Sequence, residues 1–205
     1  MKTQPANRNN IALLFPLFGS ILFIMLYFIA TQFYPGGSQV DKFSKGFSWM
    51  NNYWCNLLNE NAINGQHNAA RPIALTASIV LALTLSLFWY YFPIYTHFKK
   101  TGRLIIQYSG ILSMVLAFFL FTSFHDGIVN VSGFFGLIAL CGTFIGLYKM
   151  KALPLLYFGF FNLFLIVLNN YVYHIDGLII YLPLIQKISF LSFLLWISLI
   201  SMRFY

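Results

Sequence analysis

The stretch Phe43–Arg71, FSKGFSWMNNYWCNLLNENAINGQHNAAR, is the only long polar segment of this sequence. Long hydrophobic runs stand on both sides of it. The whole chain is 60% hydrophobic and 8% charged, whereas a soluble domain averages about 25% charged residues. A chain this apolar needs lipid around it, so the composition predicts an integral membrane protein with one compact domain.

Six apolar runs surround or follow the polar stretch, and each is close to the roughly 20 residues that a helix needs to cross about 30 Å of hydrocarbon. They are Ile11–Phe33, Pro72–Tyr95, Leu104–Phe124, Val131–Tyr148, Leu153–Tyr171 and Leu178–Met202. None alternates with the period of two that membrane β-strands show. We therefore predict an all-α fold: a single six-helix transmembrane domain over residues 1–205, with residues 34–71 as an extracytoplasmic polar insert.

The charged residues predict how this bundle is oriented. If the helices alternate in direction, one side receives Lys2, Arg8, Lys99, Lys100, Arg103, Lys149, Lys151 and Arg203 and no acid. The positive-inside rule then places both termini in the cytoplasm, with the protein in a bacterial inner membrane. All four acids, Asp41, Glu60, Asp126 and Asp176, fall on the outer side. Membrane topology accounts for the net charge of +8, so no nucleic-acid partner is predicted.

The beginning of the polar stretch has a helical pattern of its own. Apolar and aromatic side chains recur at helical spacing at Trp49, Met50, Tyr53, Trp54, Leu57 and Leu58. Serine and asparagines occupy the other face, so the pattern predicts an amphipathic helix lying at the outer membrane interface. Asn64-Gly65 is a turn signal, and Pro72 suits the first turn of the next helix.

Three histidines, His67, His125 and His174, fall at the outer ends of predicted helices, the last two in turns with the sequences HDG and HIDG. Imidazole and carboxylate ligands suit zinc, and a catalytic zinc uses three protein ligands and one open position. The sequence thus allows a zinc site, with Asp126 or Asp176 as a further ligand or general base. The alternative is that each histidine forms a hydrogen bond with a loop or a lipid phosphate.

Lys187 is the one charged residue within a predicted membrane helix away from its ends. A lysine at that depth either reaches outward along the lipid or pairs inside the bundle. We predict that it points into the bundle and towards the outer polar insert. Candidate catalytic residues are Asp126, Glu60 and Lys187, and candidate substrate-binding residues are Asn56, Asn64, Arg71, Asn170 and Asp176. A Cys55 nucleophile is the third option, although no activating base is near it in sequence.

Two segments carry a resemblance to a known family. They are Ser48 with Asn56-Leu57-Leu58 in the insert, and Gln186-Lys187 with Trp196 in the last helix. On these the chain resembles the bacterial six-helix membrane proteins of domain-of-unknown-function family 998, over most of its length. That family usually has an acid where this chain has Asn56 and a small residue where it has Leu58. The resemblance implies a fold and a topology, and no activity.

Ser123, His125 and Asp126 also give a more distant resemblance to membrane hydrolases of the ceramidase and adiponectin-receptor type, which use serine, aspartate and three histidines around zinc. This chain has six predicted helices instead of their seven and lacks the paired histidines of their last helix.

The function classes that remain are three. The first is a membrane protein with an outward-facing polar pocket, either a metal-dependent hydrolase or a binder of a lipid or lipid-linked substrate. The second is a non-enzymatic accessory subunit that packs against other membrane proteins through its Gly142/Gly146 face, because small residues allow close helix approach. The third is a transporter, in which Asn162 and Lys187 would line the midplane site.

Overall fold

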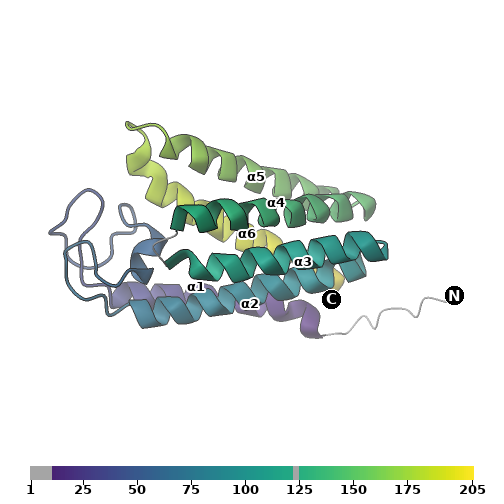
Figure 1. The fold of residues 1–205 in the computed structure, drawn as a ribbon, viewed down its shortest axis with the longest axis horizontal. Helices are drawn as coiled ribbons and strands as arrows, with labels where there is room; N and C mark the ends of the chain where they lie inside the picture. Colours follow the sequence, from purple (N-terminus) through teal and green to yellow (C-terminus); the bar gives the residue numbers. More distant parts are fainter. Residues whose placement is uncertain (1–10, 122–124) are drawn as a thin grey trace. The chain divides into compact units, whose positions relative to one another are not determined.

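The computed structural model describes residues 11–121 and 125–205, and its regular elements are helices, with a long loop segment between the first two α-helices (Figure 1). The α-helices are α1 (Phe15–Gln32), α2 (Arg71–Tyr95), α3 (Lys100–Ala117), α4 (His125–Lys149), α5 (Leu153–Tyr173) and α6 (Leu182–Phe204). Short 3₁₀ segments are η1 (Ile11–Leu14), η2 (Trp54–Leu58), η3 (Phe118–Phe121) and η4 (Ile179–Tyr181). The predicted all-α class is confirmed.

Five of the described helices are long and apolar enough to cross a membrane. These spans are Phe15–Gln32, Arg71–Tyr95, Gly127–Lys149, Leu153–Tyr173 and Ile179–Phe204. The chain is thus an α-helical membrane protein. The third predicted run is not among the five. Its helix, α3, starts with Lys100 and Arg103 in the first turn and buries Gln107, Ser109 and Ser113 on its inner face.

Most predicted helix bounds lie close to the observed ones, and one turn was predicted wrongly. The run predicted from Pro72 to Tyr95 is α2, and Pro72 lies in its first turn as expected. The turn predicted at His125–Gly127 is instead the first turn of α4. An acidic residue in a first turn is favoured by the helix dipole, so Asp126 suits a helix start as well as it suits a turn.

The described residues fall into two compact units, and most of the helices contribute to both. One unit holds residues 11–21, 80–121, 125–159 and 195–205. Its helices approach closely where glycines leave room. A Cβ added at Gly142 would lie 2.4 Å from Ile106 Cγ1, and one at Gly146 would lie 2.7 Å from Phe92. The Gly142/Gly146 face therefore packs on side chains of this same chain.

The other unit holds residues 22–79 and 160–194. Its core is an aromatic cluster of Phe23, Tyr27, Trp54 and Phe190. The ring centroid of Trp54 is 5.8 Å from that of Phe23, 5.1 Å from that of Tyr27 and 5.5 Å from that of Phe190. Trp54 comes from the polar stretch and the other three from α1 and α6, so the polar stretch is built into the core of this unit.

Candidate functional site

Residues 33–70, here called the cap, join α1 to α2 and gather beside the first turns of α2 (Figure 1). The helix predicted from Trp49 to Leu58 is not formed as such. Only η2 (Trp54–Leu58) is helical, and Ser48 to Asn51 form a turn. The physical reason is visible in the hydrogen bonds, because polar side chains of the stretch bond to neighbouring backbone groups and so compete with a regular helix.

Two fully buried asparagines hold the cap together. Asn68 Nδ2 donates to the carbonyls of Asn56, Leu57 and Asn59, at 3.2, 3.1 and 2.9 Å. Asn52 Nδ2 donates to the Gly37 carbonyl at 2.8 Å, and its Oδ1 accepts from the Ser48 amide at 2.8 Å. These side chains take the place that water has at exposed loop carbonyls.

Lys187 joins the cap to α6. Its side chain is 4% exposed. Its Nζ donates to the carbonyl of Asn52 in the cap, and to the carbonyl of Pro183 at 2.9 Å. It also lies 5.6 Å from the centre of the Phe47 ring, within reach of a cation–π attraction. The predicted inward orientation of Lys187 is confirmed.

The partners of Lys187 differ from those predicted. Glu60 and Asp176 are both exposed, and no carboxylate among the described side chains acts on Lys187. Carbonyl oxygens and an aromatic face solvate the ammonium instead. This follows from the cap's construction, since the Asn52 backbone carbonyl already points to α6 and its side chain is used within the cap.

Part of the cap packs against α1 and α6 well inside the ends of these helices. Phe23 lies nine residues before the end of α1, and Phe190 lies eight residues after the start of α6. At 1.5 Å per residue, Trp54 therefore packs about 12–14 Å inside the helix ends. Non-helical backbone at such depth is tolerated only where protein buries it. The buried Asn52, Asn68 and Lys187 supply the hydrogen bonds that make this possible.

The other polar residues predicted for the cap have local partners or face outward. Asn56 is buried and its Oδ1 accepts from the Tyr53 amide at 2.7 Å, so it braces η2. Asn64 Oδ1 accepts from the Gln66 amide at 3.0 Å, which confirms the predicted turn at Asn64-Gly65. Arg71 starts α2 half-buried. A substrate-binding role for these residues stays a prediction.

The histidines cannot be brought into one site from the described residues. His67 lies in the cap and His174 just after α5, and both are exposed. Ser123 and the side chains of His125 and Asp126 lie outside the described part of the structure. Within the part that is described, no three His, Cys, Asp or Glu side chains gather as metal ligands. The zinc site stays a prediction, and no step below depends on it.

Cys55 lies in η2 and is partly reachable from outside. Burial around the sulfur raises the pKa of the Cys55 thiol, and attraction to the Lys187 ammonium lowers it by less. The thiolate is the nucleophilic form of cysteine. A thiol with a raised pKa is a poor nucleophile, so the environment of Cys55 argues against a role in covalent catalysis.

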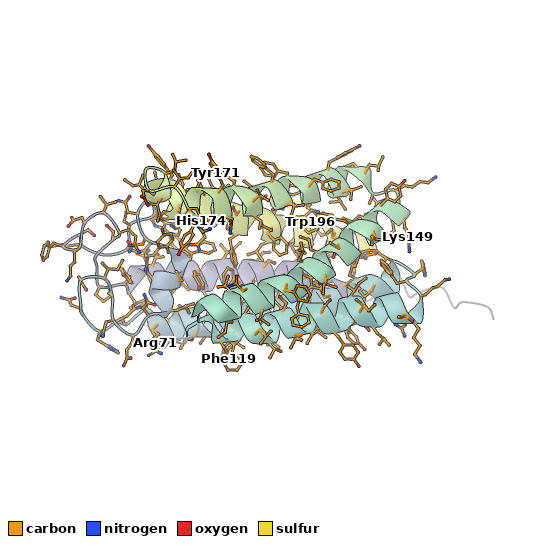
Figure 2. The ribbon with its side chains drawn as sticks, turned by 45° about the horizontal axis from the view of Figure 1, so that its top comes forward. Arg71, Phe119, Lys149, Tyr171, His174 and Trp196 are labelled. Carbon is orange, nitrogen blue, oxygen red and sulfur yellow. The ribbon has the colours of Figure 1, made fainter. Side chains whose placement is uncertain are left out.

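An open, shallow hollow of about 580 Å³ lies along the last turns of α5. Its volume lies within the ~300–1,000 Å³ of small-molecule sites. It is lined by Ile166, Val167, Asn170, Tyr171, His174 and Ile175. Figure 2 shows Tyr171 and His174 close together at this end of α5, while Arg71 stands well apart from them. Two residues of the sequence-based site, Asn170 and His174, thus meet here.

The side chains that line the hollow differ in polarity along its length. Residues four apart on a helix form one row, and the row Ile166, Asn170, His174 changes from apolar to polar up to and just past the end of α5, where Ile175 adds one apolar side chain. The neighbouring row contributes Tyr171, whose hydroxyl is polar, above Val167. The arrangement suits an amphiphile with its apolar chain beside Ile166 and Val167 and its polar group at the helix end.

Sequence reasoning missed Asn52 and Phe47, which connect the cap to Lys187 of α6, and it missed the hydrogen bonds that Asn68 makes within the cap. The available signal was the density of asparagine in a stretch that also holds two tryptophans. Comparison with protein-family models, known proteins and solved structures finds no match. The resemblance to family 998 accordingly stays a prediction.

Proposed function

We propose that this protein binds a lipid or lipid-linked molecule in the α5 hollow, with the polar headgroup at the cap's side of the membrane. The observation that carries the proposal is the division of the hollow, with Ile166 and Val167 at the deeper end and Asn170 and His174 at the end of the helix. This order matches the order of chain and headgroup in a bilayer leaflet.

The polar end of the hollow favours a headgroup that accepts hydrogen bonds. The amide of Asn170, the imidazole of His174 and the hydroxyl of Tyr171 can each donate one. No lysine or arginine lines the hollow, and no carboxylate does so among the described residues. The three donors can bond to the free oxygens of a phosphate although no cation pairs with it, whereas an ammonium headgroup would lack a carboxylate partner among the described lining residues.

The topology that goes with this function is six membrane crossings, with α3 as the sixth. Both termini lie in the cytoplasm and the cap outside a bacterial inner membrane. The excess of basic residues at the other ends of the helices supports this orientation. An accessory-subunit role has less support, because Ile106 and Phe92 of the same chain already cover the Gly142/Gly146 face.

Filling the hollow should weaken lipid binding without disturbing the fold. In Val167→Trp a large ring enters the deeper end, at a side chain that is 60% exposed. Electron spin resonance of nanodiscs would compare spin-labelled phosphatidic acid with spin-labelled phosphatidylcholine. The wild type should immobilise a larger fraction of the phosphatidic acid, and Val167→Trp should lose that preference.

The matched control is Val131→Trp, the same change at an exposed position of α4 with 49% exposure. It should keep the preference for phosphatidic acid. The proposal is wrong if the wild type immobilises both lipids equally, or if the two variants lose the preference to the same extent.

A further inference from the structure

Trp49 and Met50 occupy a turn of the cap that faces outward, in contrast to the buried side chains around them. Trp49 is 43% exposed and Met50 is 56% exposed. The turn is fixed on its inner side, where the Ser48 amide bonds to Asn52 Oδ1 at 2.8 Å and the Asn51 amide to Ser48 Oγ at 3.2 Å. Two large apolar side chains are therefore held outward by a defined backbone.

These two side chains continue the exposed face of a membrane helix. The ring centroid of Trp49 lies 6.0 Å from that of Phe28, and 5.5 Å from that of Phe47. Phe28 is 57% exposed on the span α1. Met25 and Ile29, at 56% and 43% exposure, lie beside it on the same helix. The apolar surface of the span thus passes without a break onto the cap.

The level of the Trp49–Phe28 contact along the membrane span indicates what covers this surface. Phe28 lies four residues before the end of α1, which is about 6 Å along the helix. Trp49 therefore sits near the level where a span leaves the hydrocarbon. Tryptophan is enriched at that level, because its ring is apolar and its indole N–H finds polar partners among the headgroups.

We propose that the turn Ser48–Asn51 is a membrane anchor of the cap, with Trp49 and Met50 inserted at the boundary between headgroups and hydrocarbon of the adjacent leaflet. The anchor would hold the non-helical cap against the bilayer edge on the α1 side, as Lys187 holds it to α6 inside the unit. This role is separate from lipid binding in the α5 hollow and does not depend on it.

Tryptophan fluorescence can test the anchor directly, because the other three tryptophans are buried. Trp54, Trp89 and Trp196 are 6%, 4% and 0% exposed. The protein would be placed in phosphatidylcholine vesicles that carry either a nitroxide on the headgroup or bromines at carbons 6 and 7 or 11 and 12 of the acyl chain. The emission of Trp49 is the difference between the wild type and Trp49→Phe.

Most of that difference emission should be lost with the headgroup nitroxide and the shallow bromines, and less with the deep bromines or with aqueous iodide. Trp49→Phe/Met50→Trp should regain the same quenching, which keeps the test valid if one variant folds poorly. Strong quenching by iodide with none by lipid would overturn the proposal. So would quenching by neither, which would mean that this chain or a second copy of it covers the turn.

Discussion

Replacing Lys187 with methionine is expected to lower the free energy of unfolding by about 2–4 kcal/mol, because hydrogen bonds to a charged donor are strong and a buried carbonyl left without a donor is costly. The Asn52 carbonyl has Lys187 Nζ as its donor, and Asn52 is fully buried. Methionine fills similar volume, so packing changes little. Removal of the buried charge offsets part of the loss, which sets the upper limit of the range.

Unfolding in mixed micelles of a mild detergent and sodium dodecyl sulfate would measure this difference. Lys149→Met is the control, since Lys149 is exposed and lies 4.6 Å from the centre of the Phe98 ring. It should cost no more than about 1 kcal/mol, as exposed cation–π pairs do. Equal stability of Lys187→Met and the wild type would mean that Lys187 does not hold the cap to α6.

The largest loss of stability is expected from Trp54→Ala, at about 3–5 kcal/mol for deleting a buried aromatic side chain. Trp54 is 6% exposed and its ring contacts Phe23, Tyr27 and Phe190. Its removal would leave a cavity where the cap enters the helical unit. The same unfolding measurement applies, together with protease digestion of the cap, which should become faster.

Trp54→Phe separates ring packing from hydrogen bonding. Among the described residues, the buried indole Nε1 of Trp54 has no hydrogen-bond partner, so phenylalanine loses no bond and, with a smaller cavity, should cost less than alanine does. Trp49→Ala, at an exposed position, should also cost little. If Trp54→Ala were no more destabilising than Trp49→Ala, the cap would not be part of the core.

The helices and the orientation of Lys187 were predictable because strong physical terms fix them. The length of each apolar run follows from bilayer thickness, and Pro72 marks the start of α2 as its missing amide hydrogen requires. A lysine within a span is costly in lipid, which favoured an inward Lys187 over one that reaches outward along the lipid. Its partners were not predictable, because backbone carbonyls leave no signature in the sequence.

The cap was harder to predict because the spacing of its apolar residues fits two different structures. The apolar spacing from Trp49 to Leu58 fits an amphipathic helix, yet it arises here because Trp54 and Leu57 enter the core while Trp49 and Met50 face out. The asparagine side chains form hydrogen bonds with nearby backbone groups, which disfavours a regular helix over this segment. The hollow on α5 escaped prediction as a site because its shape depends on packing, although its polar residues Asn170 and His174 were named.

Photocrosslinking at two tyrosines of α5 tests most directly whether the α5 hollow selects a lipid whose headgroup is a phosphate monoester. Benzoylphenylalanine would replace Tyr171 in the hollow or Tyr157 outside it, which are 59% and 67% exposed. Both proteins would be irradiated in nanodiscs of phosphatidylcholine with a minority of phosphatidic acid, and the adducts identified by mass. Adducts at position 171 should be enriched in phosphatidic acid over the bilayer composition, and those at position 157 should match that composition. The same lipid ratio at both positions would contradict the claim.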